Sequence, residues 1–128
     1  MSEEKEEALS RLERLYKNLD TKMTRDRYLS MCEQMGKEPD ENEIPPDWED
    51  FPDTMQSAIN IFNMLGDRVF PEIGYVGKDY TNLTHYIDVY EIEDKEFLMD
   101  TLHWLDSRAI KQSSEHLKRE YDKLKRKK

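Results

Sequence analysis

Residues 95–110, KEFLMDTLHWLDSRAI, carry the clearest helical pattern in the chain. Their apolar side chains recur every three or four positions, which places them on one face of an α-helix, and Asp94 can cap the first turn. The pattern continues more sparsely to residue 126. A single helix over residues 95–126 would be about 48 Å long at ~1.5 Å per residue. We therefore expect either one helix that projects beyond the body or a break near Ser113 and Ser114. The face consists of Phe97, Leu98, Leu102, Leu105, Ala109 and Ile110, followed by Leu117, Tyr121 and Leu124.

Four further helices are predicted upstream. Residues 3–20 have an acidic first turn and apolar residues at helical spacing. A second helix begins after Thr24 and stops at Gly36, and a third runs from Pro52 to Gly66. The fourth is predicted to begin at Asp79, which can cap it. The apolar positions of these helices are Leu9, Leu12, Tyr16 and Leu19, then Tyr28, Met31, Cys32 and Met35, then Met55, Ala58, Ile59, Phe62 and Leu65, then Leu83, Tyr86, Ile87 and Tyr90.

The predicted fold is all-α: about five helices in a small orthogonal bundle with a long, partly projecting C-terminal helix. The length of 128 residues fits one domain. We divide it into an acidic helical body, residues 1–110, and a basic C-terminal helical extension of the same domain, residues 111–128. Residues 67–78 contain Pro71, Gly74 and Gly77 and predict a loop or a short hairpin.

Charge is unevenly distributed along the chain. The net charge is −9, but residues 108–128 carry +6 and residues 1–107 carry −15. The densest acidic segment is residues 37–53, with eight acids against one lysine and four of the five prolines. We expect an irregular connection there, because proline removes backbone donors and pushes its predecessor toward extended conformations. The apolar residues Ile44, Trp48 and Phe51 are expected to pin this loop to the body.

Composition argues for a soluble cytosolic chain. Charged residues make up 38% and no apolar run approaches the ~18 residues that a membrane span needs. The acidic N-terminal residues do not resemble a secretory signal, and the single cysteine, Cys32, excludes an internal disulfide.

No pattern of catalytic, metal-binding or cofactor-binding residues stands out. His85, His103 and His116 lack the spacing of a zinc site, and residues 40–43 lack the glycine and closing glutamate of an EF-hand loop. Residues 74–79 lack the Lys-Ser/Thr ending of a phosphate-binding loop. Cys32 lies in an apolar stripe, where a thiol is usually inert. The prediction is therefore a protein that is not an enzyme and has no catalytic residue, metal or cofactor.

The basic C-terminal segment has three interpretations. It can be a solvated helix end whose cations complement the helix dipole, a nucleic-acid contact in which Tyr121 stacks on a base, or a docking element for an acidic protein surface such as residues 37–53 of a second copy. The apolar stripe favours docking, because a helix in water alone has no use for it. The candidate contact residues are Leu117, Lys118, Arg119, Tyr121, Lys123, Leu124, Lys125 and Arg126 in the tail, and Ile44, Trp48, Glu49, Asp50 and Phe51 in the acidic loop.

About two thirds of the chain, residues 45–125, resembles small helical proteins encoded among the structural genes of tailed bacteriophages, of the kind associated with tail assembly chaperones. The matching motifs are Ile44-Pro45-Pro46-Asp47, Ala58-Ile59-Asn60-Ile61-Phe62, Leu65-Gly66, Gly77-Lys78-Asp79-Tyr80, Leu83, Ile87-Asp88-Val89-Tyr90, Asp106 and Ala109-Ile110-Lys111. These are structural signatures, and the resemblance carries over no residue of defined chemistry.

The resemblance implies a non-enzymatic assembly or minor structural protein that acts through protein–protein contacts in the host cytoplasm or on the virion. Its expected partners are other phage structural or assembly proteins, with homo-oligomers as a further option and no membrane. The first alternative is a nucleic-acid-associated phage protein, either a small packaging subunit or a transcription accessory factor, that uses the basic helix. A second alternative is a host-directed inhibitor whose acidic residues 37–53 imitate DNA.

Overall fold

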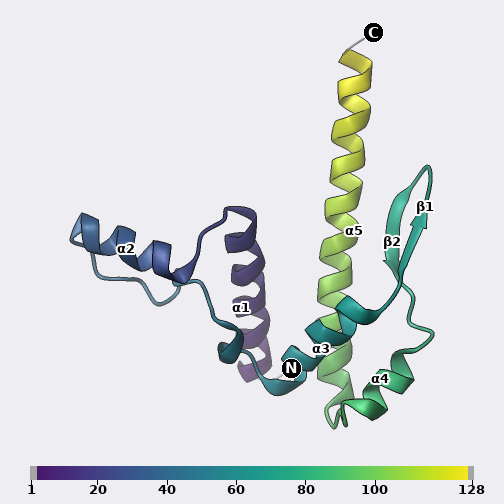
Figure 1. Cartoon of the computed structure of the whole chain (residues 1–128), viewed down its shortest axis with the longest axis horizontal. Helices are drawn as coiled ribbons and strands as arrows, with labels where there is room; N and C mark the ends of the chain where they lie inside the picture. Colours follow the sequence, from purple (N-terminus) through teal and green to yellow (C-terminus); the bar gives the residue numbers. More distant parts are fainter. Residues whose placement is uncertain (1–2, 127–128) are drawn as a thin grey trace. The chain divides into compact units, whose positions relative to one another are not determined.

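The computed structural model describes residues 3–126, which form two compact units divided between Gln56 and Ser57. Helices make up 67% of the structure, and the described residues contain five α-helices and a two-stranded sheet (Figure 1). The prediction of a mostly helical fold is confirmed. The chain is not strictly all-α, because the segment predicted as a loop or a short hairpin forms two strands.

The first unit contains α1 (Glu3–Asp20), α2 (Arg25–Met35), a short 3-10 turn η1 (Trp48–Asp50) and the beginning of α3 (Asp53–Met64). Both predicted ends of α2 are confirmed. The Thr24 hydroxyl accepts the Arg27 N–H at 3.1 Å, and Gly36 closes the helix in the left-handed conformation with φ of 65°. The Gly36 N–H and Lys37 N–H donate to carbonyls of the last turn, which satisfies acceptors that the helix itself leaves open.

The predicted apolar stripe of α2 is only partly covered. Cys32 is buried and Tyr28 is half-buried, but Met31 and Met35, which share the stripe, are exposed. Met64 at the end of α3 is also exposed, whereas Met55 is fully buried. Helical spacing identifies a face but not whether another element covers it.

The second unit is built on α5 (Lys95–Arg126), against which α3 and α4 (Leu83–Val89) supply apolar side chains. Its core combines residues from all three helices, from the position directly after the end of α3 and from the link before α5, namely Ala58, Ile61, Leu65, Leu83, Ile92, Leu98 and Leu102. Phe62 and four further half-buried side chains, Tyr80, Tyr86, Ile87 and Tyr90, pack around it. The face that residues 97–105 present was therefore predicted correctly.

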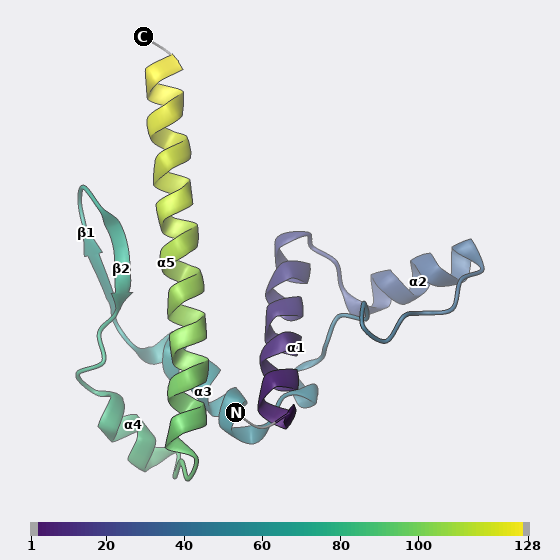
Figure 2. The same ribbon diagram turned by 180° about the vertical axis from the view of Figure 1, so that it is seen from behind.

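Strands β1 (Asp67–Phe70) and β2 (Gly74–Lys78) form an antiparallel hairpin, with Asp67 opposite Lys78 and a register shift between Arg68 and Val69. The Ile73 N–H donates to the Phe70 carbonyl across the turn. The hairpin lies alongside α5 in both views (Figure 2).

The start of α4 differs from the prediction. Asn82, and not Asp79, occupies the N-cap position. The Asp79 carboxylate instead accepts the N–H and the hydroxyl of Thr81, at 2.9 and 2.5 Å, and these two bonds lower the pKa of Asp79. The aspartate thus closes a local turn before the helix rather than capping it.

Helix α5 continues without a break through Ser113 and Ser114. Of the two expected arrangements, the continuous helix is the one observed, and the side chains of residues 118–126 are exposed.

Candidate functional site

Asp106 joins the hairpin to α5. Its side chain is 7% exposed and accepts three hydrogen bonds. The Tyr75 hydroxyl donates to Oδ1 at 2.5 Å, while the Tyr80 hydroxyl and the Lys78 backbone N–H donate to Oδ2 at 2.6 and 3.2 Å. One carboxylate on the helix thus holds two residues of β2 and one that follows it.

These contacts keep Asp106 ionised and both tyrosines neutral. Burial alone would raise the pKa of Asp106, but the hydrogen bonds from Tyr75, Tyr80 and the Lys78 N–H outweigh it and lower the pKa. The pKa of Tyr75 and that of Tyr80 are raised well above the usual tyrosine value, by burial first and then by the adjacent Asp106 carboxylate. The three side chains therefore satisfy one another and form a structural clasp.

Two glycines let β2 approach the helix. At Gly74, with φ of 84°, a Cβ atom would lie 2.8 Å from Leu117 Cδ1 and 3.1 Å from Ser113 Oγ. At Gly77, with φ of 129°, it would lie 3.3 Å from Asp106 Oδ2. The Ser113 hydroxyl also accepts the Tyr75 N–H at 3.3 Å. The predicted glycine-containing segment is therefore a close-contact strand, because only glycine fits both the backbone conformation and the space.

A hollow of about 430 Å³ lies where the core of the second unit ends, between the hairpin, α3 and α5. Lys78 lies at its wall, with Nζ 2.6 Å from Asp67 Oδ1, 3.3 Å from the Leu65 carbonyl and 4.6 Å from the Phe62 ring centroid. The lysine charge is thus already compensated by an acid, a carbonyl and an aromatic face. The remaining lining side chains are Tyr75, Ala109, Gln112, Ser113 and His116.

The face of α5 that contacts the hairpin continues past it. A Cβ added at Gly77 or Gly74 would lie within 4 Å of side chains that recur at helical spacing, namely Asp106, Ile110, Ser113 and Leu117. The next positions in the same series are Tyr121 and Leu124, and these are 65% and 62% exposed. The hairpin thus covers the first part of one helix face, and the remainder of that face is apolar and in solvent.

The predicted tail residues therefore divide into two groups. Leu117 is half-buried against Gly74 and belongs to the contact with the hairpin. The other seven, Lys118, Arg119, Tyr121, Lys123, Leu124, Lys125 and Arg126, are exposed. Within this group Lys123 Nζ lies 3.5 Å from Glu120 Oε1, an exposed pair of small energetic weight. Tyr121 and Leu124, flanked by cations, are called the docking face below.

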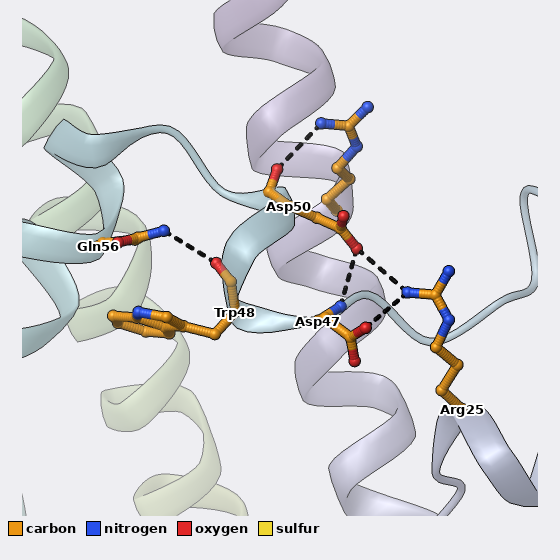
Figure 3. Close-up of polar contacts among 6 residues, drawn as sticks. Arg25, Asp47, Trp48, Asp50 and Gln56 are labelled. Atoms are coloured by element: carbon orange, nitrogen blue, oxygen red, sulfur yellow. Dashed lines mark hydrogen bonds and ion pairs between the residues drawn. The ribbon is translucent and has the colours of Figure 1, made fainter.

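The acidic loop is held by arginines of its own unit. Arg25 Nη1 lies 2.7 Å from Asp47 Oδ2 and 3.7 Å from Asp50 Oδ2, and Arg11 Nη1 donates to the Asp50 carbonyl at 3.2 Å (Figure 3). The Asp47 N–H donates to Asp50 Oδ2 at 2.9 Å, which closes the turn of η1. Gln56 Nε2 donates to the Trp48 carbonyl from the start of α3. Two of the loop's carboxylates are therefore already compensated.

The five loop residues predicted to contact a partner do not form one exposed surface. Phe51 is 3% exposed, so its side chain cannot meet a partner in this structure, and Ile44 is half-buried. Trp48, Glu49 and Asp50 are exposed, and the Trp48 indole points away from Arg25 (Figure 3). The expectation that apolar residues pin the loop holds for Phe51, whereas Trp48 is 44% exposed.

Asp106, Tyr75 and Tyr80 were not singled out from the sequence as a contact group. One signal could have identified the first of them. Asp106 interrupts an apolar face, directly after Leu105 and one turn before Ile110, where an acid is costly unless donors surround it. The tyrosines lie some 30 residues upstream, and only the hairpin brings them to the helix.

Within residues 3–126 no three His, Cys, Asp or Glu side chains gather closely enough to bind a metal ion. The helices of this part of the chain also include none long and apolar enough to cross a bilayer.

No protein-family model matches the chain, and no curated protein or solved structure is significantly similar to it.

Proposed function

We propose that the chain is a non-enzymatic protein that acts through protein–protein contacts in the assembly or minor structure of a tailed-bacteriophage particle, in the manner of a tail assembly chaperone. The phage assignment rests on the resemblance of residues 45–125. The assignment to protein contacts rests on one observation, the docking face that continues the hairpin-covered side of α5 into solvent.

The apolar area of this α5 face is only partly covered by the chain itself. The same helix face contacts the chain's own hairpin at Ile110 and Leu117, and one turn later Tyr121 and Leu124 are exposed. Burying side chains of this size stabilises a contact by roughly 1.5–3 kcal/mol each. An amphipathic face on an exposed helix is a common docking element for another protein segment.

The polar cluster of the second unit supports a structural role rather than a catalytic one. A general acid or base must reach a substrate proton, whereas Asp106 is buried and all its hydrogen bonds go to the hairpin and the segment that follows it. The clasp fixes the hairpin, and the hairpin in turn defines where the covered part of the α5 face ends.

The second candidate function is nucleic-acid binding. Seven cations lie between Arg108 and Arg126, and the exposed Tyr121 ring could stack on a base. The strongly acidic residues 1–107 would repel a phosphate backbone, which favours the protein-contact proposal.

Fluorescence anisotropy of a labelled DNA duplex separates the two candidates. The variant for comparison ends at Leu117, because ending at Arg108 would also remove Ile110, Ser113 and Leu117 from the hairpin contact. We expect no binding at about 50 mM salt. Binding that weakens by orders of magnitude at about 200 mM salt and is lost with residues 118–128 would establish nucleic-acid binding instead.

A photocrosslinking amino acid at position 121 tests the docking face directly. The chain is expressed together with the products of neighbouring genes, and the same group at Glu115 is the control, because that exposed position lies on the side of α5 opposite Asp106 and Leu117. We expect a protein adduct from position 121 and little from position 115. Equal adducts from both positions, or none from either, would contradict the proposal.

A further inference from the structure

The two ends of the second unit carry opposite charge. Residues 88–100, which include the end of α4 and the start of α5, hold six acids and one lysine. Residues 108–126 hold seven cations and three acids. The net charges are −5 and +4, and α5 connects the two regions as one continuous helix.

The acidic end also exposes apolar side chains. Val89 is 62% and Met99 is 45% exposed, and the acids Asp88, Glu93 and Glu96 of the same segment are exposed as well. This combination is complementary to the docking face, in which Tyr121 and Leu124 are surrounded by cations. Contacts that match both apolar area and charge favour one orientation of the partners.

The acidic loop of the first unit is a poorer match for the same face. Arg25 already compensates the carboxylates of Asp47 and Asp50, and Phe51 is buried. A second tail is also a poor match, because two segments of charge +4 repel each other.

Resting on the proposed function, we propose that the docking face binds the acidic end, residues 88–100, of a second copy of this chain. Each copy then offers a basic apolar end and an acidic apolar end, so the contact is head-to-tail. Such a heterologous contact leaves one face free at either end and generates open chains or closed rings rather than an isolated dimer.

The contact is small and therefore weak. Residues 117–126 extend about 15 Å along the helix, which is short compared with interfaces of standard size. We expect association that increases with protein concentration and decreases with salt, since exposed charges are screened beyond about 10 Å at ~0.1 M ionic strength.

Charge reversal in pairs tests this contact on the full chain. The tail variant carries Lys118→Glu, Lys123→Glu and Lys125→Glu, and the head variant carries Asp88→Lys, Glu93→Lys and Glu96→Lys. Sedimentation velocity measures mass from about 10 µM to about 1 mM protein at low salt, which covers the range of weak interfaces. The control variant carries Lys22→Glu, Arg27→Glu and Lys37→Glu. It has the same net charge as the tail variant, and its substitutions lie at exposed positions of the first unit.

We expect the wild type and the control to associate above the monomer mass of 15.4 kDa, and each of the tail and head variants to remain at that mass. An equimolar mixture of the tail and head variants should regain association, because each reversed end then meets an end of opposite sign. Circular dichroism of every variant establishes that its helices are intact.

A wild type that stays monomeric throughout the concentration range would refute the head-to-tail contact, and so would a mixture that fails to regain association. The proposed function is tested separately by the adduct at position 121. An adduct with a different protein and no self-association would leave the proposed function standing and remove the second copy as occupant.

Discussion

Asp106 shows how a single residue connects segments far apart in the sequence. Its carboxylate binds the Tyr75 and Tyr80 hydroxyls, 31 and 26 residues upstream, and a backbone N–H between them. Hydrogen bonds to a charged acceptor are shorter and stronger than neutral ones. All three donors belong to the hairpin or follow it directly, so removing the charge should mainly weaken the attachment of the hairpin to α5.

Asp106→Asn should lower the free energy of unfolding by about 2 kcal/mol, because it removes the charge and places an NH₂ group against donors. Urea unfolding followed by circular dichroism measures the loss. Asp100→Asn, the same chemical change on the same helix, is the control and should alter stability by less than about 0.5 kcal/mol.

The pH dependence of the stability difference shows whether the charge of Asp106 causes the loss. The pKa of Asp106 is lowered by folding, so its ionised form stabilises the fold fully above the ordinary aspartate pKa of about 3.9, and this stabilisation is lost as pH falls through the lowered value. The stability gap between wild type and Asp106→Asn should therefore be constant at neutral pH and close in strong acid. A gap that does not change with pH would mean that shape, and not charge, accounts for the effect.

At the scale of elements, the hairpin depends on how closely β2 lies against α5. A Cβ at Gly74 would enter the space of Leu117 and Ser113, and a two-stranded hairpin of four and five residues whose first strand is exposed has little other apolar support. The hairpin and the helix therefore stabilise each other.

Gly74→Ala should reduce the free energy of unfolding by about 2–4 kcal/mol, from backbone strain and steric overlap together. Gly36→Ala is the matched control, because its φ is also positive but no atom lies within 4 Å of the added Cβ. The control should lose only about 1 kcal/mol, the cost of strain alone. Equal losses in denaturant unfolding would show that the contact with Leu117 carries no weight.

The sequence predicted elements whose ends are set by local chemistry. Thr24 and Gly36 bound α2 because a hydroxyl cap and a left-handed glycine act on neighbouring backbone groups. Asp79 does not cap α4 because the helix begins only at Leu83, and the aspartate carboxylate closes a separate turn with Thr81. The exposure of Met31 and Met35 could not be predicted, since it depends on which elements pack against α2. The tail was identified as a candidate site from its charge and stripe, but the clasp at Asp106 required the tertiary fold.

At the scale of the whole molecule, residues beyond Leu117 are expected to serve binding rather than folding. Residues 118–126 are exposed along their length, so the hairpin and the core do not depend on them. This separation lets the two roles be tested independently.

A chain that ends at Leu117 should retain the free energy of unfolding of the full chain within about 0.5 kcal/mol. A chain that ends at Arg108 should lose more than about 2 kcal/mol, because the apolar contacts of Ile110 and Leu117 with the hairpin are removed. Chemical denaturation of both variants makes the comparison. A large loss in the longer variant would show that the last turns of α5 support the fold.

The continuity of α5 from Lys95 to Arg126 has a metric consequence. A helix without a hinge keeps its two ends at a fixed separation of about 48 Å, because each residue advances the axis by ~1.5 Å. In a head-to-tail assembly every added copy would therefore advance by a constant step, and one secondary-structure element would set the axial repeat.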